Sequence, residues 1–173
     1  ENASVRKTDN RRERFLTLEE VSRLGEAFDQ AETDGANPKA VAIARLWALT
    51  GCRRNEIAAL KVHEVKLDQS LFEFDDTKTG KSIRPFGPAA AALLAELLKD
   101  RKSGYVFPAE TGDGYYQSTR KVWAEVIKIA KLHGVTPHTL RHTLGSTATS
   151  SGEALALTGA ILCHANLRST AIY

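Results

Sequence analysis

Apolar residues recur every three or four positions along much of the chain, and this period outlines its first helices. The pattern is clear over residues 18–31, where it predicts an amphipathic helix with one buried face. Thr17 stands just before this segment and Glu20 follows three positions later, the arrangement of a capping box. The apolar positions are Leu18, Val21, Leu24 and Phe28.

A second helix is predicted over residues 39–50, where apolar side chains cover nearly the whole circumference. A helix that is apolar all round is buried in the core of its protein. Asn37 and Pro38 supply an N-cap and a first-turn proline, and Gly51 supplies the left-handed residue that ends a helix. A short helix is then expected over residues 53–60.

The period changes from helical to twofold over residues 71–75, which is the clear strand signal of the sequence. Residues 82–86 can return beside this strand, and Pro85 indicates an edge strand or a strand end. Residues 65–68 are a candidate for a third short strand. The connection over residues 76–81 has turn chemistry, so it would hold two lysines at the tip of a hairpin. These lysines are Lys78 and Lys81.

Further helices are predicted in the second half of the chain. Pro88 opens a helix rich in Ala and Leu that extends to about Lys99, after which residues 105–107 form a short buried piece. A long amphipathic helix is predicted over residues 115–132. Its Trp123 lies on the apolar side, so we expect this ring in the core.

Gly134 ends that long helix, and Pro137 opens the next one. A break at residues 150–152 precedes a helix that ends near residue 163, and a last short helix begins at Leu167. The sequence therefore predicts a fold that is mainly α with a small antiparallel β-sheet, in the α+β class.

Composition sets bounds on the class of protein. The chain has 173 residues, enough for one domain with a proper core. A net charge of +3 permits a nucleic-acid partner but does not argue for one. No apolar run approaches the roughly 20 residues that would span a membrane, and no signal peptide is seen. Cys52 and Cys163 stand far apart in unlike contexts, so we expect two reduced thiols in a cytosolic protein.

Residues 1–14 are polar and basic, and they offer almost nothing to bury. They are interpreted as an interdomain linker or arm. Such a segment can bind along a polyanion or be a solvated tail, and the sequence leaves these two possibilities equally open. The sequence contains no methionine, even at position 1. We therefore expect the chain to begin inside a longer protein.

Several side chains near the C-terminal end have the chemistry needed to handle a phosphodiester. His138 and Arg141 are three residues apart, so on a helix they share a face. His164 and Tyr173 are nine residues apart and can converge only where the chain turns between them. Cationic donors and a hydroxyl nucleophile suit phosphoryl transfer. No carboxylate cluster has the pattern expected of two-metal catalysis, so no metal or cofactor is expected.

Four motifs occur in one order along the chain. They are Thr50-Gly-Cys-Arg53-Arg-Asn-Glu56-Ile, Thr77-Lys78-Thr-Gly-Lys, His138-Thr-Leu-Arg141-His142, and Leu162-Cys-His164 with Tyr173 nine residues later. In this order and spacing the chain closely resembles the catalytic domain of the tyrosine recombinases, the phage integrase family, over residues 15–173. The basic segment 1–14 would then be the end of a linker. The family's N-terminal core-binding domain and C-terminal tail would be absent.

The resemblance implies a role for each motif residue. Arg53 and Arg141 would clamp the scissile phosphate, with His164 as a further donor, because guanidinium groups meet such oxygens bidentately. Tyr173 would be the nucleophile, and its hydroxyl, with an ordinary pKa of about 10, would need a base or a cationic surrounding. His138 would act as general base or orient the phosphate.

Two more roles follow from the same resemblance. Lys78 would be the general acid that protonates the departing 5′ oxygen, from a hairpin able to move once DNA is bound. Glu56 would support the clamp arginine or the histidine pair, although a structural ion pair is an equal alternative. The reaction implied is metal-free, with a 3′-phosphotyrosyl intermediate.

Other expectations concern DNA contacts and assembly. Residues beside the motifs are candidates for phosphate contacts that position the protein without reading sequence. These are Arg54, Lys81, Arg84 and Thr139. The resemblance also implies double-stranded DNA as partner, a homotetramer on paired sites for the full-length protein, a monomeric fragment, and a bacterial or phage-encoded protein of the cytoplasm and nucleoid. Cys163 departs from the family, which usually has glycine before the histidine.

Three alternatives remain. The first is a catalytically inactive DNA-binding regulator on the same fold, against which the complete set of motif residues speaks. The second is a type IB topoisomerase-like enzyme that nicks and closes DNA without strand exchange, and the short motifs favour a recombinase over it. The third is a plain helical protein whose motifs arose by chance.

Overall fold

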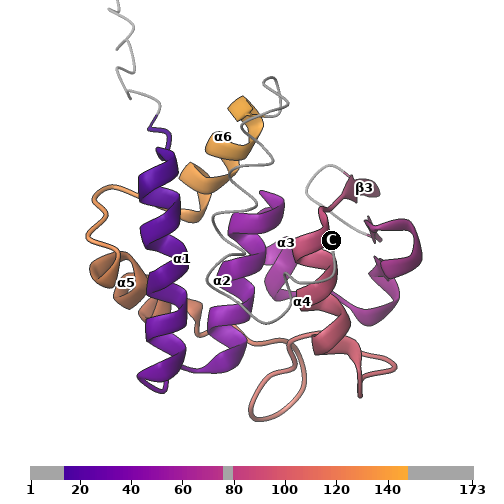
Figure 1. Ribbon diagram of the computed structural model, residues 1–173. Coiled ribbons are helices and arrows are strands. Elements are labelled where there is room, and N and C mark those ends of the chain that lie inside the picture. Colours follow the sequence, from indigo (N-terminus) through magenta and orange to yellow (C-terminus); the bar gives the residue numbers. More distant parts are fainter. Residues whose placement is uncertain (1–13, 76–79, 148–173) are drawn as a thin grey trace, which may run out of the picture.

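The computed structural model describes residues 14–75 and 80–147, and these residues form a helical body with a small sheet beside it (Figure 1). The fold class predicted from the sequence is confirmed. The α-helices are α1 (Leu18–Thr33), α2 (Pro38–Thr50), α3 (Arg54–Ala58), α4 (Pro88–Leu98), α5 (Thr119–Ile129) and α6 (Pro137–Thr147). The strands are β1 (Val65–Lys66), β2 (Leu71–Phe74) and β3 (Ser82–Pro85), with 3-10 turns η1 (Val62–Glu64) and η2 (Leu67–Gln69).

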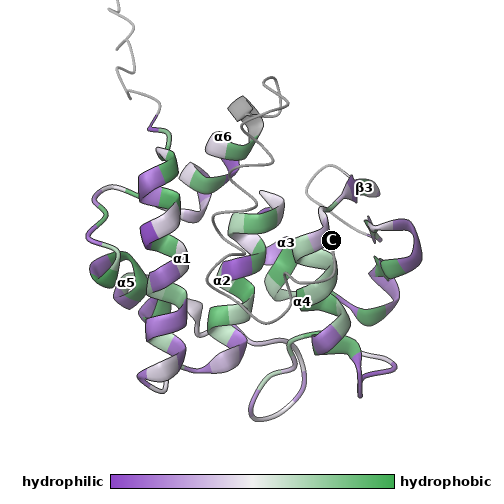
Figure 2. Cartoon of the chain, in the orientation of Figure 1, coloured by the Kyte–Doolittle hydropathy of each residue, from purple (hydrophilic) through white to green (hydrophobic). Residues whose placement is uncertain are grey.

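Helix α2 is the centre of the packing. It contacts α1, α3, α4, α5 and α6. Residues 40–48 of this helix are all buried, which agrees with the apolar circumference of its sequence. Figure 2 shows hydrophobic colour along much of α2, whereas α1 carries hydrophilic bands on the side that faces outward. The sole charged residue in that buried stretch, Arg45, pairs with Asp29 and Glu32 of α1 at 2.7 and 2.8 Å.

The predicted helix ends are confirmed at α1 and α2. The Glu20 amide donates to Thr17 Oγ1 at 3.2 Å and the Thr17 amide donates to Glu20 Oε2 at 3.0 Å, which completes the capping box. Asn37 Oδ1 accepts from the Lys39 amide at 3.0 Å. Gly51 has φ of +61° and ends α2 in the left-handed conformation.

The sheet is antiparallel in the order β1-β2-β3, so β3 is an edge strand and Pro85 lies where a proline is tolerated. Phe72 stands opposite Val65 on one side and opposite Arg84 on the other. The ring of Phe72 lies 5.3 Å from that of Phe74 and 4.7 Å from that of Phe86, between ring centroids. The inner face of the sheet is thus an aromatic cluster that joins the core.

The long helix predicted over residues 115–132 is wrong at both ends. Tyr115 pairs with Pro108 in an antiparallel bridge, and the Tyr116 amide donates to the Phe107 carbonyl at 2.8 Å, so helix α5 begins only at Thr119. These backbone bonds come from a segment seven to nine residues earlier, so the apolar period within residues 115–132 does not reveal them. Helix α5 ends at Ile129, and Lys131, with φ of +53°, precedes the expected stop at Gly134.

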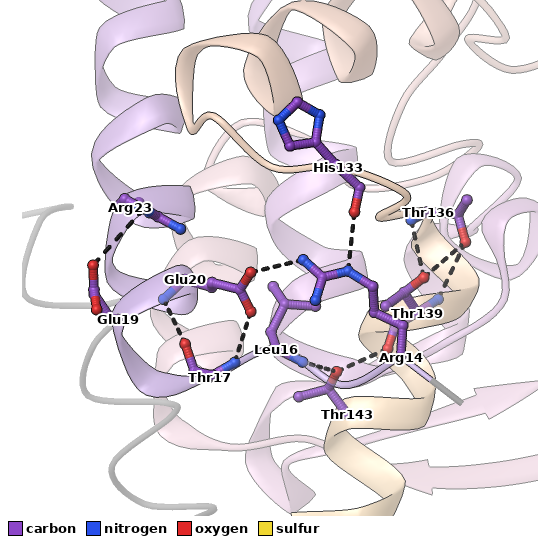
Figure 3. Close-up of polar contacts among 10 residues, drawn as sticks. All are labelled: Arg14, Leu16, Thr17, Glu19, Glu20, Arg23, His133, Thr136, Thr139 and Thr143. Atoms are coloured by element: carbon purple, nitrogen blue, oxygen red, sulfur yellow. Dashed lines mark hydrogen bonds and ion pairs between the residues drawn. The ribbon is translucent and has the colours of Figure 1, made fainter. Parts of the chain in front are cut away.

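The first described residues are hydrogen-bonded to helix α6 and to the loop before it (Figure 3). Arg14 Nε donates to the His133 carbonyl at 2.9 Å, and its Nη2 donates to Glu20 Oε1 at 2.7 Å. The Leu16 amide donates to Thr143 Oγ1 of α6 at 3.1 Å. Arg14, assigned from the sequence to the arm, therefore packs on the helical body. Within the described residues, none of the helices combines the length and apolar character needed to cross a membrane.

Candidate active site

The junction between α2 and α3 positions Arg53. Once Gly51 has ended α2, the chain is extended at Arg53, which is the N-cap of α3. Glu56 in the first turn of α3 receives two hydrogen bonds from Arg53, one from its backbone amide at 2.7 Å and one from its Nη1 at 2.8 Å. These two attachments set the direction of a guanidinium group that is still 40% exposed.

Glu56 is ionised within this arrangement. Its side chain is 7% exposed, and burial opposes the charged form. The hydrogen bonds from Arg53 and the charge of Arg84 outweigh burial, so the pKa of Glu56 lies below its ordinary value. The sequence left open whether Glu56 supports the clamp arginine or the histidine pair. Its contacts are with Arg53 and Arg84, so they favour support of the arginine.

Helix α6 delivers Arg141 to the same junction. Arg141 Nη1 donates to the Gly51 carbonyl at 2.8 Å, across 90 positions of sequence. The approach is close, because a Cβ atom at Gly51 would lie 3.3 Å from Leu144 Cδ1 and 3.7 Å from Arg141 Cα. The two arginines expected to clamp a phosphate are therefore held at one turn of chain, with Arg53 only two residues after Gly51.

His138 and His142 form a pair on the exposed side of α6. Their Nε2 atoms are 2.7 Å apart and their rings cross at 86°, with centroids 4.2 Å apart. Between two neutral rings only one of these nitrogens carries the shared proton. His142 occurs in the predicted motif without a role of its own. The signal in the sequence was its spacing of four residues from His138 on a helix.

Cys52 lies beneath the charged groups and is 2% exposed. Burial and the negative charge of Glu56 raise the pKa of its thiol to about 11, against a hydrogen bond from Thr50 and the positive charges of Arg84 and Arg141. The thiol is therefore in its neutral form at neutral pH.

The other predicted contacts differ in exposure. Arg54 and Lys81 are exposed, and the Arg54 guanidinium lies 5.8 Å from the centroid of the Trp47 ring. Arg84 is partly buried against Glu56. Thr139 is buried, and its Oγ1 accepts from the Thr136 amide at 3.1 Å in the first turn of α6. Because Thr139 is only 8% exposed, we do not assign it a phosphate contact.

Three predicted catalytic residues and one predicted departure fall outside the described residues. They are Lys78, His164, Tyr173 and Cys163. In the parts of the chain that the structure describes, no group of three His, Cys, Asp or Glu side chains gathers as ligands for a metal ion.

Comparison with known proteins identifies the family to which the sequence is similar. The sequence model of the Phage integrase family matches residues 14–173. Tyrosine recombinase XerD of Pseudomonas putida is 29% identical over 91% of this chain and 56% of its own length. Tyrosine recombinase XerC of Bacillus pumilus is 30% identical over 98% of this chain and 59% of its own length. The chain spans just over half the length of these relatives.

Solved structures agree on the fold. The XerA recombinase superposes with a TM-score of 0.63 at 26% identity, over 88% of this chain and 55% of that one. The integrase of transposon Tn1549, in complex with circular intermediate DNA, gives a TM-score of 0.60 at 17% identity, over 92% of this chain and 60% of that one.

Proposed function

Because the chain belongs to the phage integrase family, we propose that it is the catalytic domain of a tyrosine-type, site-specific DNA recombinase. Residues 15–173 would form this domain, and residues 1–14 would end a linker from a preceding domain. The substrate is double-stranded DNA. The reaction is strand cleavage and rejoining through a covalent link to Tyr173, without a cofactor.

The observation that carries the proposal is the meeting of Arg53 and Arg141 at the α2–α3 junction. One arginine is tied down by Glu56 and the other by the Gly51 carbonyl, although they are far apart in sequence. Charge builds on the non-bridging oxygens during phosphoryl transfer, and preorganised guanidinium groups stabilise it with little rearrangement. Removing a single preorganised donor of this kind costs about 2.7–4 kcal/mol of barrier.

The remaining steps rest on the motif residues. The Tyr173 oxygen forms a bond to the phosphorus, and the bond to the 5′ oxygen breaks. His138 takes the proton of the phenol or orients the phosphate, His164 donates to a non-bridging oxygen, and Lys78 protonates the departing 5′ oxygen. The phosphotyrosyl link retains the energy of the phosphodiester, so a second 5′ hydroxyl can reverse the step without ATP.

Around this centre, exposed cations would hold the flanking backbone. Arg54 and Lys81 lie at the surface near the junction and the hairpin, and we assign them to flanking phosphates. Arg84, which is partly buried against Glu56, is also assigned to a phosphate contact. A full-length protein of this kind would assemble as a homotetramer on two paired sites, whereas the fragment would be monomeric. DNA as substrate would put the protein in the bacterial cytoplasm, at the nucleoid.

The family relationship favours a recombinase over an inactive regulator or a nicking-closing topoisomerase. A substrate with a nick close to the cleavage site separates these functions, because the released fragment diffuses away and the covalent adduct accumulates. We expect the unmodified protein to give an adduct that migrates slowly in a denaturing gel, and Tyr173→Phe to give none. Equal trapping by Tyr173→Phe would refute the assignment of the nucleophile.

The general acid can be tested separately. Lys78→Ala is expected to slow cleavage of ordinary DNA but not of DNA with a 5′-thio leaving group, since a thiolate departs without a proton. Persistent slow cleavage of the thio substrate by Lys78→Ala would remove Lys78 from this role.

A further inference from the structure

In strand β3 the apolar side chain faces solvent and the charged side chain next to it faces inward, the reverse of the usual pattern. Ile83 is 67% exposed, whereas the next side chain, Arg84, is 25% exposed. Arg84 stands directly opposite Phe72, which is fully buried, so the two residues share the inner face of the sheet. A strand built only for stability would place the isoleucine inside and the arginine outside. Local rules of this kind are broken at functional sites.

The Arg84 guanidinium is incompletely paired. Its Nη2 lies 3.7 Å from Glu56 Oε1, which is an ion pair but beyond good hydrogen-bond length. Its Nε is buried and has no hydrogen-bond partner among the described residues. Arg53 donates to both oxygens of Glu56 at 2.7 and 2.8 Å, so this carboxylate is held closer to Arg53 than to Arg84. A buried donor without a partner is costly, so an acceptor from outside would complete the arrangement.

Three guanidinium groups from three separate elements converge here. Arg53 and Arg84 share Glu56 Oε1, and Arg141 donates to the carbonyl of Gly51, two residues before Arg53. In these contacts Glu56 is the carboxylate that pairs with Arg53 and Arg84, whereas the acceptor for Arg141 is a neutral carbonyl group. Like charges held together without enough counter-charge favour the binding of an anion, and a phosphate accepts from several guanidinium groups at once.

We infer that Arg84 is a third arginine ligand of the phosphate that is cleaved, acting beside Arg53 and Arg141 rather than on a flanking phosphate. This inference rests on the proposed function and deepens it. Through Glu56 it also joins strand β3 to α3, so that one carboxylate sets the positions of two phosphate-binding arginines.

Arg84→Gln tests the inference in the full-length protein with the nicked substrate under single-turnover conditions. A ligand of the reacting phosphate is needed mainly in the transition state, so we expect the cleavage rate at saturating DNA to fall about 10- to 100-fold. Affinity for DNA should change much less than the rate. Arg84→Lys keeps the positive charge but loses the planar guanidinium group, so its cleavage rate should lie between those of the unmodified protein and Arg84→Gln.

The position of the phosphate can be identified by removing its charge. A methylphosphonate at the cleaved position carries no negative charge and needs less cationic stabilisation, so it should restore most of the cleavage lost in Arg84→Gln. A methylphosphonate at the neighbouring position should not. Arg120→Gln, the same change at an exposed arginine of α5 that has no assigned role, is the matched control and should leave the rate at saturation unchanged.

The two proposals fail in different ways. If the unmodified protein forms no adduct, the proposed function fails. If it forms the adduct and Arg84→Gln cleaves bound DNA at the same rate, or regains its rate only with the neighbouring methylphosphonate, Arg84 is not a ligand of the cleaved phosphate. Urea unfolding of Arg84→Gln shows whether the fold is kept, and Arg84→Lys gives the answer if the glutamine variant unfolds.

Discussion

Glu56 connects two of the arginines at the candidate site. It holds the backbone and the side chain of Arg53, and it is the partner of Arg84. A carboxylate was expected here from the sequence, but its partners were left open between the arginine and the histidine pair. The structure identifies two arginines, one of them from a distant strand.

Glu56→Gln should reduce stability in a way that depends on pH. At neutral pH the variant loses hydrogen bonds to a charged group, which are worth about 1.5–3 kcal/mol of unfolding free energy. Because the pKa of Glu56 is lowered by folding, its stabilising effect is present above its ordinary value of 4.5 and is lost as the pH falls below it.

Urea unfolding of both proteins, from neutral pH down to about pH 3, measures this effect. The difference in unfolding free energy between the natural protein and Glu56→Gln should be largest at neutral pH and should shrink as the solution is acidified. A difference that does not vary with pH would mean that the ionised carboxylate is not the stabilising species.

His142 offers a second prediction at the level of one residue. Its Nε2 lies 2.7 Å from that of His138, so His142→Ala removes the contact that orients the His138 ring. A hydrogen bond worth about 1 kcal/mol corresponds to a cleavage rate about fivefold lower. DNA affinity should be unchanged. His133→Ala, at another exposed histidine whose ring is not in this pair, should cleave normally, and equal rates for both variants would contradict the orienting role.

Among the elements, α2 and its left-handed end were predicted correctly because the signals are local. Asn37, Pro38 and Gly51 act on backbone groups within a few residues of themselves, so their effect does not depend on the rest of the fold. The error over residues 115–132 has the opposite cause. Its apolar period is real, but Tyr116 bonds to the backbone of Phe107, and this pairing outcompetes the first helical turns.

Gly51→Ala should destabilise the protein more than the same change at Gly35. Both glycines have positive φ, so each substitution costs about 1–2 kcal/mol in backbone strain. At Gly51 the new methyl group would also press on Leu144 of α6, which adds roughly 1 kcal/mol. At Gly35 no atom lies within 4 Å of the added group.

Thermal or urea unfolding of the two variants gives the comparison, and the cleavage assay adds a second measurement. The Gly51 carbonyl accepts from Arg141, so Gly51→Ala should also slow cleavage, whereas Gly35→Ala should not. Equal losses of stability would show that the approach of α6 to Gly51 is looser than the contacts indicate.

At the scale of the whole molecule, helix α6 and the loop before it are joined to the residues that precede α1. Thr143 is 2% exposed and accepts from the Leu16 amide, while its own hydroxyl donates to the Thr139 carbonyl at 2.9 Å (Figure 3). Together with Arg14, which bonds to the His133 carbonyl, this contact joins the entry to α1 to the helix that carries Arg141.

Thr143→Val keeps the shape of the side chain but leaves the buried Leu16 amide without this acceptor. An unsatisfied buried amide costs about 1–3 kcal/mol, so the urea midpoint should fall accordingly. Thr33→Val is the control, because Thr33 is exposed and its hydroxyl bonds only within α1, and its cost should stay below about 0.5 kcal/mol. Similar losses in both variants would show that the Leu16 contact contributes nothing.

The sequence by itself determined the class of fold, the ends of α1 and α2, the edge position of β3 and the order of the motifs. These follow from periodicity, capping and residue spacing, which act over a few neighbouring residues. Only the tertiary structure decided that Arg141 is anchored on Gly51 and that Arg84 faces inward to Glu56. Such contacts depend on how helices and strands pack across long separations, and no local pattern specifies that packing.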